Sequence, residues 1–327
     1  MARPKTPAPT AAMPEVSAAG HRPDDTAPAA GPGPSSIAER VSAVVVNHDA
    51  GAALVECVAS LRAEGVVDVT VVDNASSDGS ADALASADAA VRLVQTGTNL
   101  GYGAAANRGI DVSGLDLVLV SNPDVAVHRG ALAALVEVLG ADPVLAIAGP
   151  RILEADGTRY PSARRFPSLL DAAGHALFGD LAPDNRFTQR YRMGDLASDQ
   201  VTEVDWVSGA FFLARRRALE ELGGFDESYF MYAEDTDLCW RARRAGWGVV
   251  YVPEAVVTHV QGISTARRPY RMLVAHHRSV FHFAARTERG WRRVALPATA
   301  VLLTLRLAVM CARQALGALR SAARRAE

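Results

Sequence analysis

Acidic and amide residues recur directly after the predicted strands in the first half of the chain. Asn47 ends the first strand, Asp73-Asn74 and Asp78 follow the second, and Asn122-Pro-Asp124 follows the fourth. The carboxyl ends of parallel strands meet at one edge of a sheet, and ligands bind there. One such segment alone is more typical of an ordinary turn or a helix N-cap than of a binding site. Several at the same edge favour a polar binding site.

A glycine-rich segment follows the third predicted strand. It reads Asn99-Leu-Gly101-Tyr-Gly103 and continues to Asn107 at the start of a predicted helix. The glycine spacing imitates a dinucleotide-binding fingerprint, but that fingerprint follows the first strand of its βαβ unit and this segment follows the third. We interpret it as a loop whose glycines allow the backbone to approach a bound nucleotide closely.

Asp124 is the candidate ligand for a hard cation. Proteins commonly hold Mg²⁺ or Mn²⁺ with one carboxylate together with the phosphate oxygens of a substrate. His259, at the end of a strand predicted over residues 247–258, is a candidate second ligand. The alternatives are an ordinary turn aspartate and a structural histidine. A cation here would absorb the charge that develops on a diphosphate leaving group.

A second acidic cluster, Glu234, Asp235 and Asp237, stands at the predicted start of a later helix. Acids in a first helical turn interact favourably with the helix dipole, and we interpret Asp237 in that way. We interpret Asp235 as a general base, because the aromatic segment 229–232 raises the pKa of a neighbouring carboxyl towards neutral pH. Glu234 is the next candidate for the base.

The elements that carry these residues alternate between strand and helix. The strands are short, nearly continuous apolar runs, which predicts an α/β fold with a mainly parallel sheet covered by helices on both faces. The predicted strands cover 42–46, 66–72, 91–95, 115–120 and 144–148, and the predicted helices cover 52–63, 79–87, 103–110 and 129–139.

The composition excludes several classes of protein. The chain has 327 residues, 49% of them apolar, and a formal net charge of −2. A nucleic-acid-binding protein usually carries a basic excess, so we expect no nucleic-acid partner. The three cysteines lie far apart, which argues against a disulfide framework and for a reducing compartment. We expect a disordered Pro/Ala-rich extension over 1–38, a catalytic domain over 39–270 and a helical region over 271–327.

The C-terminal region is both basic and apolar. From Arg286 onwards it contains nine arginines and two glutamates, a net charge of +7. The uninterrupted apolar run from Val294 to Leu305 has 12 residues, which is short for a membrane-spanning helix. Together these features predict a helix lying at an anionic membrane surface. The alternative is a helix packed on the catalytic domain.

Taken together, the motifs resemble those of the inverting family 2 glycosyltransferases, which have the GT-A fold. The resemblance covers residues 41–265 and includes Trp206-x-Ser-Gly209 and the Gly-Gly-Phe-Asp-Glu segment that leads to Glu234-Asp235. It implies a catalytic base at Asp235 beside Glu234, and Mg²⁺ or Mn²⁺ at Asp124 and His259. Asn122 replaces the first acid of the family's DxD motif. The implied donor-nucleotide residues are Asn47, Asp73, Asn74, Asp78, Asn99, Gly101, Gly103, Asn107 and Asn122.

A narrower resemblance points to a rhamnosyltransferase branch that acts in actinobacterial cell-wall synthesis. It rests on the segments 160–170, 175–179 and 275–279. It implies a nucleotide-sugar donor, dTDP-rhamnose, and a lipid-linked sugar acceptor, decaprenyl-diphospho-GlcNAc. It also implies a cytoplasmic enzyme held peripherally at the inner face of the plasma membrane. Arg164, Trp206 and Gly209 are the implied acceptor-binding residues.

Two other functions remain open from the residues alone. A sugar-1-phosphate nucleotidyltransferase uses a similar sheet, but it needs a basic glycine-rich loop after the first strand, where this chain has Asn47-His-Asp-Ala-Gly51. A non-catalytic carbohydrate- or nucleotide-binding module has no need for both Asp124 and Asp235.

Overall fold

The computed structural model describes residues 36–166, 199–260 and 269–326, with side chains described up to residue 318. The described part begins at Ser36 and opens with the short helix α1 (Ile37–Arg40). The extension predicted over 1–38 therefore lies almost entirely outside the described residues, as does the segment 175–179. The described residues belong to one compact unit.

The first half of the sheet is parallel. Residues Val44 and Asn47 of β1 stand beside Thr70 and Asp73 of β2. All seven residues of β1 are buried, as expected for an apolar strand covered on both faces. The parallel strands are β1 (Val41–Asn47), β2 (Asp68–Asp73), β3 (Arg92–Gln95) and β4 (Leu117–Ser121), in the spatial order β3-β2-β1-β4.

The second half of the sheet is mixed. β11 (Phe211–Arg215) runs antiparallel between β4 and β6 (Leu145–Leu153). β12 (Gly248–His259) is parallel to β6, and β5 (Val125–Val127) lies antiparallel on its outer side. Short strands complete this half: β7 (Arg159–Tyr160) pairs with β6, β9 (Thr202–Glu203) with β12, and β8 (Ala163–Arg164) with β10 (Trp206–Val207). The prediction of a mainly parallel α/β sheet is confirmed; the antiparallel insertion of β11 is not predicted by the sequence pattern.

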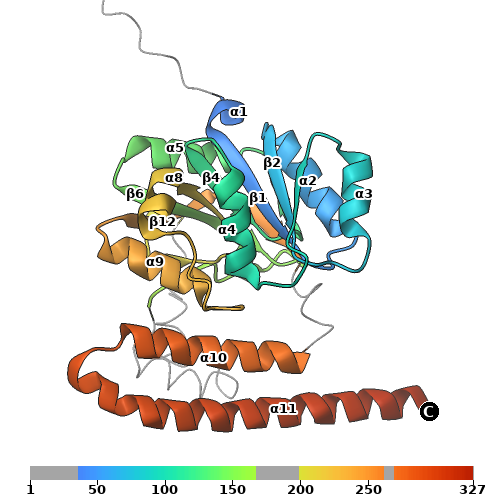
Figure 1. Ribbon diagram of the computed structural model, residues 1–327, viewed down its shortest axis with the longest axis vertical. Coiled ribbons are helices and arrows are strands. Elements are labelled where there is room, and N and C mark those ends of the chain that lie inside the picture. Colours follow the sequence, from blue (N-terminus) through green and yellow to red (C-terminus); the bar gives the residue numbers. More distant parts are fainter. Residues whose placement is uncertain (1–35, 167–198, 261–268, 327) are drawn as a thin grey trace, which may run out of the picture. The chain divides into compact units, whose positions relative to one another are not determined.

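Helices cover both faces of the sheet (Figure 1). Alternate residues of β1 enter two different hydrophobic clusters, Val45 in one and Val44 and Val46 in the other, because successive side chains of a strand point to opposite faces. The first cluster includes α2 (Ala53–Ala63), α3 (Ser80–Ala87) and α5 (Ala131–Ala141); the second includes α4 (Tyr102–Val112), α8 (Arg216–Leu222) and α9 (Glu234–Arg244).

Two long helices follow the sheet. α10 (Pro269–Thr287) and α11 (Leu296–Ala326), joined through a 3₁₀ turn at Gly290–Ala295, pack against each other (Figure 1). The segment Gly290–Ala318 is long and apolar enough to cross a membrane by length and composition, and none of it is buried. Its internal charge, Arg306, is partly buried and lies beside α10, with a guanidinium nitrogen 3.4 Å from Nε2 of His277.

Candidate active site

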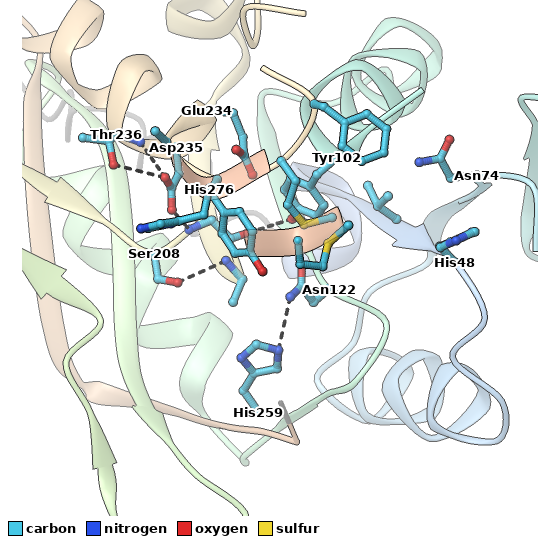
Figure 2. A pocket seen from close by; sticks show the side chains of 18 of the residues that line it. His48, Asn74, Tyr102, Asn122, Ser208, Glu234, Asp235, Thr236, His259 and His276 are labelled. Atoms are coloured by element: carbon cyan, nitrogen blue, oxygen red, sulfur yellow. Dashed lines mark hydrogen bonds between the residues drawn. The ribbon is translucent and has the colours of Figure 1, made fainter. Parts of the chain in front are cut away.

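A pocket of about 390 Å³ opens at the carboxyl ends of the strands (Figure 2). Its lining combines the residues that follow β1, β2 and β4 with the end of β12 and the start of α9. Of the residues predicted from the sequence, the lining contains Asn74, Asn99, Asn122, Asp124, Arg164, Trp206, Gly209, Glu234, Asp235 and His259. The polar edge expected from the parallel strands is therefore present in the folded chain.

The pairing of β5 with β12 brings Asp124 and His259 together. His259 stands opposite Val125, so its ring reaches back to the turn after β4. Its Nε2 lies 3.0 Å from Oδ1 of Asp124 and 3.1 Å from Nδ2 of Asn122. Nδ1 of His259 is buried and has no hydrogen-bond partner within the described ranges. One carboxylate oxygen and one imidazole nitrogen, both largely shielded from water, fit a divalent cation that completes its shell with substrate oxygens.

A strained turn presents the second acidic pair. Tyr232 and Ala233 have φ values of 70° and 64°, in the left-handed region that costs a non-glycine residue roughly 1–3 kcal/mol. α9 begins immediately afterwards, so Glu234 and Asp235 point from its first turn into the pocket (Figure 2). Backbone strain next to a pocket persists only where surrounding contacts enforce it.

The C-terminal helix α10 supplies those contacts. The hydroxyl of Ser279 donates to the carbonyl of Met231 at 2.8 Å. Nε of Arg286 lies 3.2 Å from the fully buried carboxylate of Asp237, and the same guanidinium contacts Asp226. Asp237 also forms an ion pair with Arg241 at 2.6 Å and does not line the pocket. Its place in the first turn of α9 agrees with the interpretation of Asp237 as a structural acid at the start of a helix. No local sequence pattern indicates that a helix so far downstream restrains this turn.

The two acids of the pair differ in their surroundings. Oδ2 of Asp235 accepts a hydrogen bond from the amide of Gly209 at 2.8 Å, and Oδ1 accepts one from the amide of Thr236 at 2.7 Å. Oε2 of Glu234 is buried without a hydrogen-bond partner in the described part of the chain. Amide donors stabilise a carboxylate, whereas an unsolvated, unpartnered carboxyl favours its neutral form.

The shifts in the pKa values of the two carboxyl groups favour the same difference. Desolvation, followed by the neighbouring charge of Asp235, raises the pKa of Glu234 to about 8. Desolvation also raises the pKa of Asp235, but hydrogen bonds from Gly209 and Thr236 and the charge of Arg164 oppose that rise. Repulsion between two adjacent carboxylates favours keeping a proton on the pair, and the amide donors at Asp235 favour that proton on Glu234.

The donor-nucleotide residues predicted after β1 and β2 form a network of hydrogen bonds. Nδ2 of Asn47 donates to Asp73 at 2.9 Å. Asp78 accepts from the amides of Gly51 at 2.7 Å and Ser80 at 3.0 Å. Asn47, Asp73 and Asp78 are not part of this pocket lining; Asn47 and Asp73 are buried, whereas Asp78 is exposed beside them.

The glycine-rich segment contacts both the loop after β2 and the turn before α9. Asn74 lines the pocket and donates to the carbonyl of Gly101 at 3.1 Å. A Cβ on Gly101 would collide with the carbonyl oxygen of Phe230, so only glycine permits this approach. Asn107 is bonded on both sides to the backbone of Phe225, at 2.9 Å each, and lies outside the lining with Gly101 and Gly103.

The three predicted acceptor-binding residues, Arg164, Trp206 and Gly209, all line the pocket. The guanidinium of Arg164 lies 5.0 Å from the ring centre of Trp206 and 5.4 Å from that of Tyr160, and it donates to the hydroxyl of Tyr160. Gly209 does more than line this wall: its amide donates to Asp235, and its carbonyl accepts from the hydroxyl of Tyr102 at 2.6 Å.

Several lining residues are not predicted by the sequence motifs. Among them are His48, Arg271, Met272, His276, Val280 and Phe283. All of these except His48 come from α10, which shows that the helical region predicted over 271–327 contributes to the pocket. The only signal in the sequence is the motif at 275–279, which carries a family resemblance but does not by itself indicate a site.

Comparison with known families identifies the chain. The sequence profile described as "Glycosyltransferase like family 2" matches residues 38–281. The chain belongs to this family. The glycosyltransferase is 43% identical over 248 residues to the N-acetylglucosaminyl-diphospho-decaprenol L-rhamnosyltransferase of Mycobacterium tuberculosis, a match that covers 72% of this chain and 80% of that protein. It is 31% identical over 133 residues to the rhamnosyltransferase WbbL of Escherichia coli, covering 41% and 47% of the two chains.

Solved structures confirm the GT-A fold of the glycosyltransferase. The mannosyltransferase PcManGT of Pyrobaculum calidifontis, in complex with GDP-Man and Mn²⁺, superposes with a TM-score of 0.54 at 19% identity, over 88% of this chain and 80% of that one. GalNAc-T7 with UDP, GalNAc and Mn²⁺ gives a TM-score of 0.51 at 15% identity, over 68% and 44%.

The proton on Glu234 predicts how stability depends on pH. Because the pKa rises from 4.5 to about 8 on folding, the folded state keeps a proton that the unfolded chain loses. The free energy of unfolding therefore falls as the pH rises through this window. Glu234→Gln should abolish that part of the slope and stabilise the protein most above pH 8, by roughly 1.4 kcal/mol per unit of pKa shift removed.

Urea unfolding between pH 4 and 9 measures this slope. Glu254→Gln is the matched control, because Glu254 is exposed, and it should keep the wild-type slope. An unchanged slope in Glu234→Gln would show that Glu234 is not the buried proton carrier.

Proposed function

We propose that this enzyme is an inverting rhamnosyltransferase that moves L-rhamnose from dTDP-rhamnose to a polyprenyl-diphosphate-linked GlcNAc in the synthesis of a cell-wall or surface polysaccharide. The observation that carries the proposal is the 43% identity, over 72% of the chain, to a protein with this named activity. The pocket supports it, because a base, a cation-binding pair and a second wall of aromatic and basic residues meet in one cavity.

Asp235 acts as the base. Its carboxylate accepts the proton of the acceptor hydroxyl while that oxygen forms a bond to the anomeric carbon. The bond from the anomeric carbon to the donor phosphate breaks on the opposite face, and its electron pair leaves with dTDP. Gly209 and Thr236 keep both oxygens of Asp235 oriented through their amides. Glu234, which holds a proton, adds no second negative charge beside the developing oxocarbenium ion.

Asp124 and His259 are the residues that would hold Mg²⁺ or Mn²⁺, with Asn122 beside them. A bound cation supplies charge compensation for the departing diphosphate. Both side chains belong to the turn after β4 and the end of β12, which are fixed to each other by the β5–β12 ladder. Asp124 is the only one of the three side chains that brings a negative charge. We therefore infer that the cation enters mainly as a complex with the donor nucleotide.

The exposed side of α11 supports a position at the membrane. Val301, Leu305 and Val309 are 60%, 62% and 53% exposed and follow one another at intervals of four residues, so they form one apolar stripe. Arg292 and Arg293 precede the helix and are exposed. This arrangement fits a helix at the anionic inner face of the plasma membrane, where a lipid-linked acceptor is found.

Transfer of labelled sugar tests the proposed function. Purified enzyme with Mn²⁺ or Mg²⁺ should transfer rhamnose from dTDP-rhamnose to a polyprenyl-diphospho-GlcNAc and release dTDP. UDP- and GDP-sugars are the comparison donors. Transfer from one of these and not from dTDP-rhamnose would contradict the donor assignment.

Asp235→Asn should lower kcat by roughly 10²–10⁴, the usual contribution of a positioned general base. The amide keeps the size of the side chain but accepts no proton. Glu234→Gln resembles the protonated side chain and should lower kcat far less. Turnover rates of both variants under saturating substrates measure the difference. The reverse order of effects would make Glu234 the base.

Metal binding should depend on the nucleotide. Calorimetric titration of Mn²⁺ should show weak binding to the free protein and tighter binding with dTDP present. Asp124→Ala should abolish the nucleotide-dependent component, whereas His259→Ala should weaken it less, because a neutral imidazole contributes no charge. Tight binding without nucleotide that survives Asp124→Ala would place the cation on other residues.

Membrane association should depend on the apolar stripe of α11. Replacing Val301, Leu305 and Val309 with Asn should weaken binding to anionic vesicles by more than about tenfold, because each apolar side chain contributes on the order of 1 kcal/mol when it leaves water. The matched control replaces three exposed valines of the catalytic domain, Val67, Val144 and Val201, with Asn. Vesicle cosedimentation measures both variants. Equal binding by the two would show that α11 does not contact the membrane.

A further inference from the structure

The helix α10 has the pocket on one side and α11 on the other. Met272, His276, Val280 and Phe283 line the pocket. His277, one residue beyond His276, contacts Arg306 of α11. A single helix thickness therefore separates the pocket from the helix that bears the apolar stripe. A substrate held in a membrane at α11 would approach the pocket along α10.

Arg271 stands in the first turns of α10, at the pocket, and its side chain is exposed. Its guanidinium lies 4.7 Å from the ring centre of Phe230. Within the described ranges 36–166, 199–260 and 269–326, Arg271 has no ion pair and no hydrogen-bond acceptor. Stacking on an aromatic face fixes the plane of a guanidinium and leaves its edge of N–H donors available for a ligand.

Phe230 is itself held in place. Its carbonyl accepts a hydrogen bond from the amide of Tyr102 at 3.0 Å, and Gly101 is in tight contact with the same carbonyl. The residue that follows, Met231, is fixed to α10 through Ser279. The aromatic platform under Arg271 is therefore anchored both to α4 and to α10.

The charges around the pocket show what Arg271 is free to bind. Asp124 and Asp235 make the interior acidic. The other lining arginine, Arg164, already donates to Tyr160 and to the carbonyl of Pro161. A cation at Asp124 and His259 would compensate the charge of the donor diphosphate. An acceptor diphosphate brings further negative charge and needs a cationic partner of its own, at the side of the pocket nearest the membrane helix.

We propose that Arg271 binds the diphosphate of the lipid-linked acceptor and thereby orients the acceptor sugar towards Asp235. The inference rests on the proposed function and adds to it a binding residue for the acceptor. Bidentate hydrogen bonds from guanidinium to phosphate oxygens provide both the attraction and the orientation.

Two acceptor substrates distinguish recognition of the diphosphate from recognition of the sugar. The first is a polyprenyl-diphospho-GlcNAc, and the second is a GlcNAc glycoside of a long-chain alcohol, which has the same sugar and no phosphate. Arg271→Gln should raise the KM of the first by about 10–100-fold, the expected loss for hydrogen bonds to a charged group. The KM ratio between the two acceptors should therefore collapse, while the KM of the donor stays at its wild-type value. Arg271→Lys keeps the charge and loses the bidentate geometry, so its KM for the diphosphate acceptor should lie between the values of the wild type and Arg271→Gln.

Arg278→Gln is the matched control. Arg278 lies two turns further along α10, is exposed and is not part of the pocket lining, so its loss removes the same charge from the same helix. It should leave both acceptor KM values unchanged. Thermal unfolding of each variant checks that the fold is intact.

The remaining outcomes overturn the inference in distinguishable ways. Equal rises in KM for the two acceptors would mean that Arg271 does not recognise the diphosphate. A rise in the donor KM alone would assign Arg271 to the donor diphosphate. Absence of transfer to either acceptor by the wild-type enzyme would refute the proposed function, and this inference would fall with it.

Discussion

Two neighbouring carboxyl groups, Glu234 and Asp235, line one pocket, and desolvation raises the pKa of both. Amide donors stabilise charge on Asp235, and nothing in the described part of the chain does so for Oε2 of Glu234. This asymmetry gives the pair one proton and one carboxylate near neutral pH. The proposed base, Asp235, would then have a neutral carboxylic acid as its nearest acidic neighbour.

The position of this pair depends on a strained turn and on a helix far away in sequence. Left-handed conformations at Tyr232 and Ala233 are unfavourable in an isolated chain. Ser279 and Arg286 of α10 hold the segment from both ends. α10 also packs against α11, whose exposed stripe is apolar. The C-terminal helices thus connect the exposed apolar stripe of α11 to the wall of the pocket, which agrees with the proposed lipid-linked acceptor.

Much of this arrangement is predictable from the sequence, because short apolar runs identify buried strands and polar residues after them identify the ligand edge. That reasoning places Asn122, Asp124 and His259 in one site, where the folded chain has them. A run of apolar residues looks the same in a parallel and an antiparallel strand, so the sequence does not predict that β11 is antiparallel to its neighbours. Asn107 is expected at the nucleotide, but its side-chain amide is hydrogen-bonded to the backbone of Phe225. No local sequence pattern distinguishes an asparagine that binds a ligand from one that binds a distant backbone segment. The motifs do not predict Arg271 as a pocket residue, because long-range packing brings α10 there.

Infrared difference spectroscopy of the carboxyl groups tests the central claim directly. At neutral pH the wild-type enzyme should show the C=O band of a protonated, buried carboxylic acid. That band should disappear in Glu234→Gln and persist in Asp235→Asn. A band that persists in Glu234→Gln and is lost in Asp235→Asn would place the proton on Asp235 and contradict its role as the base.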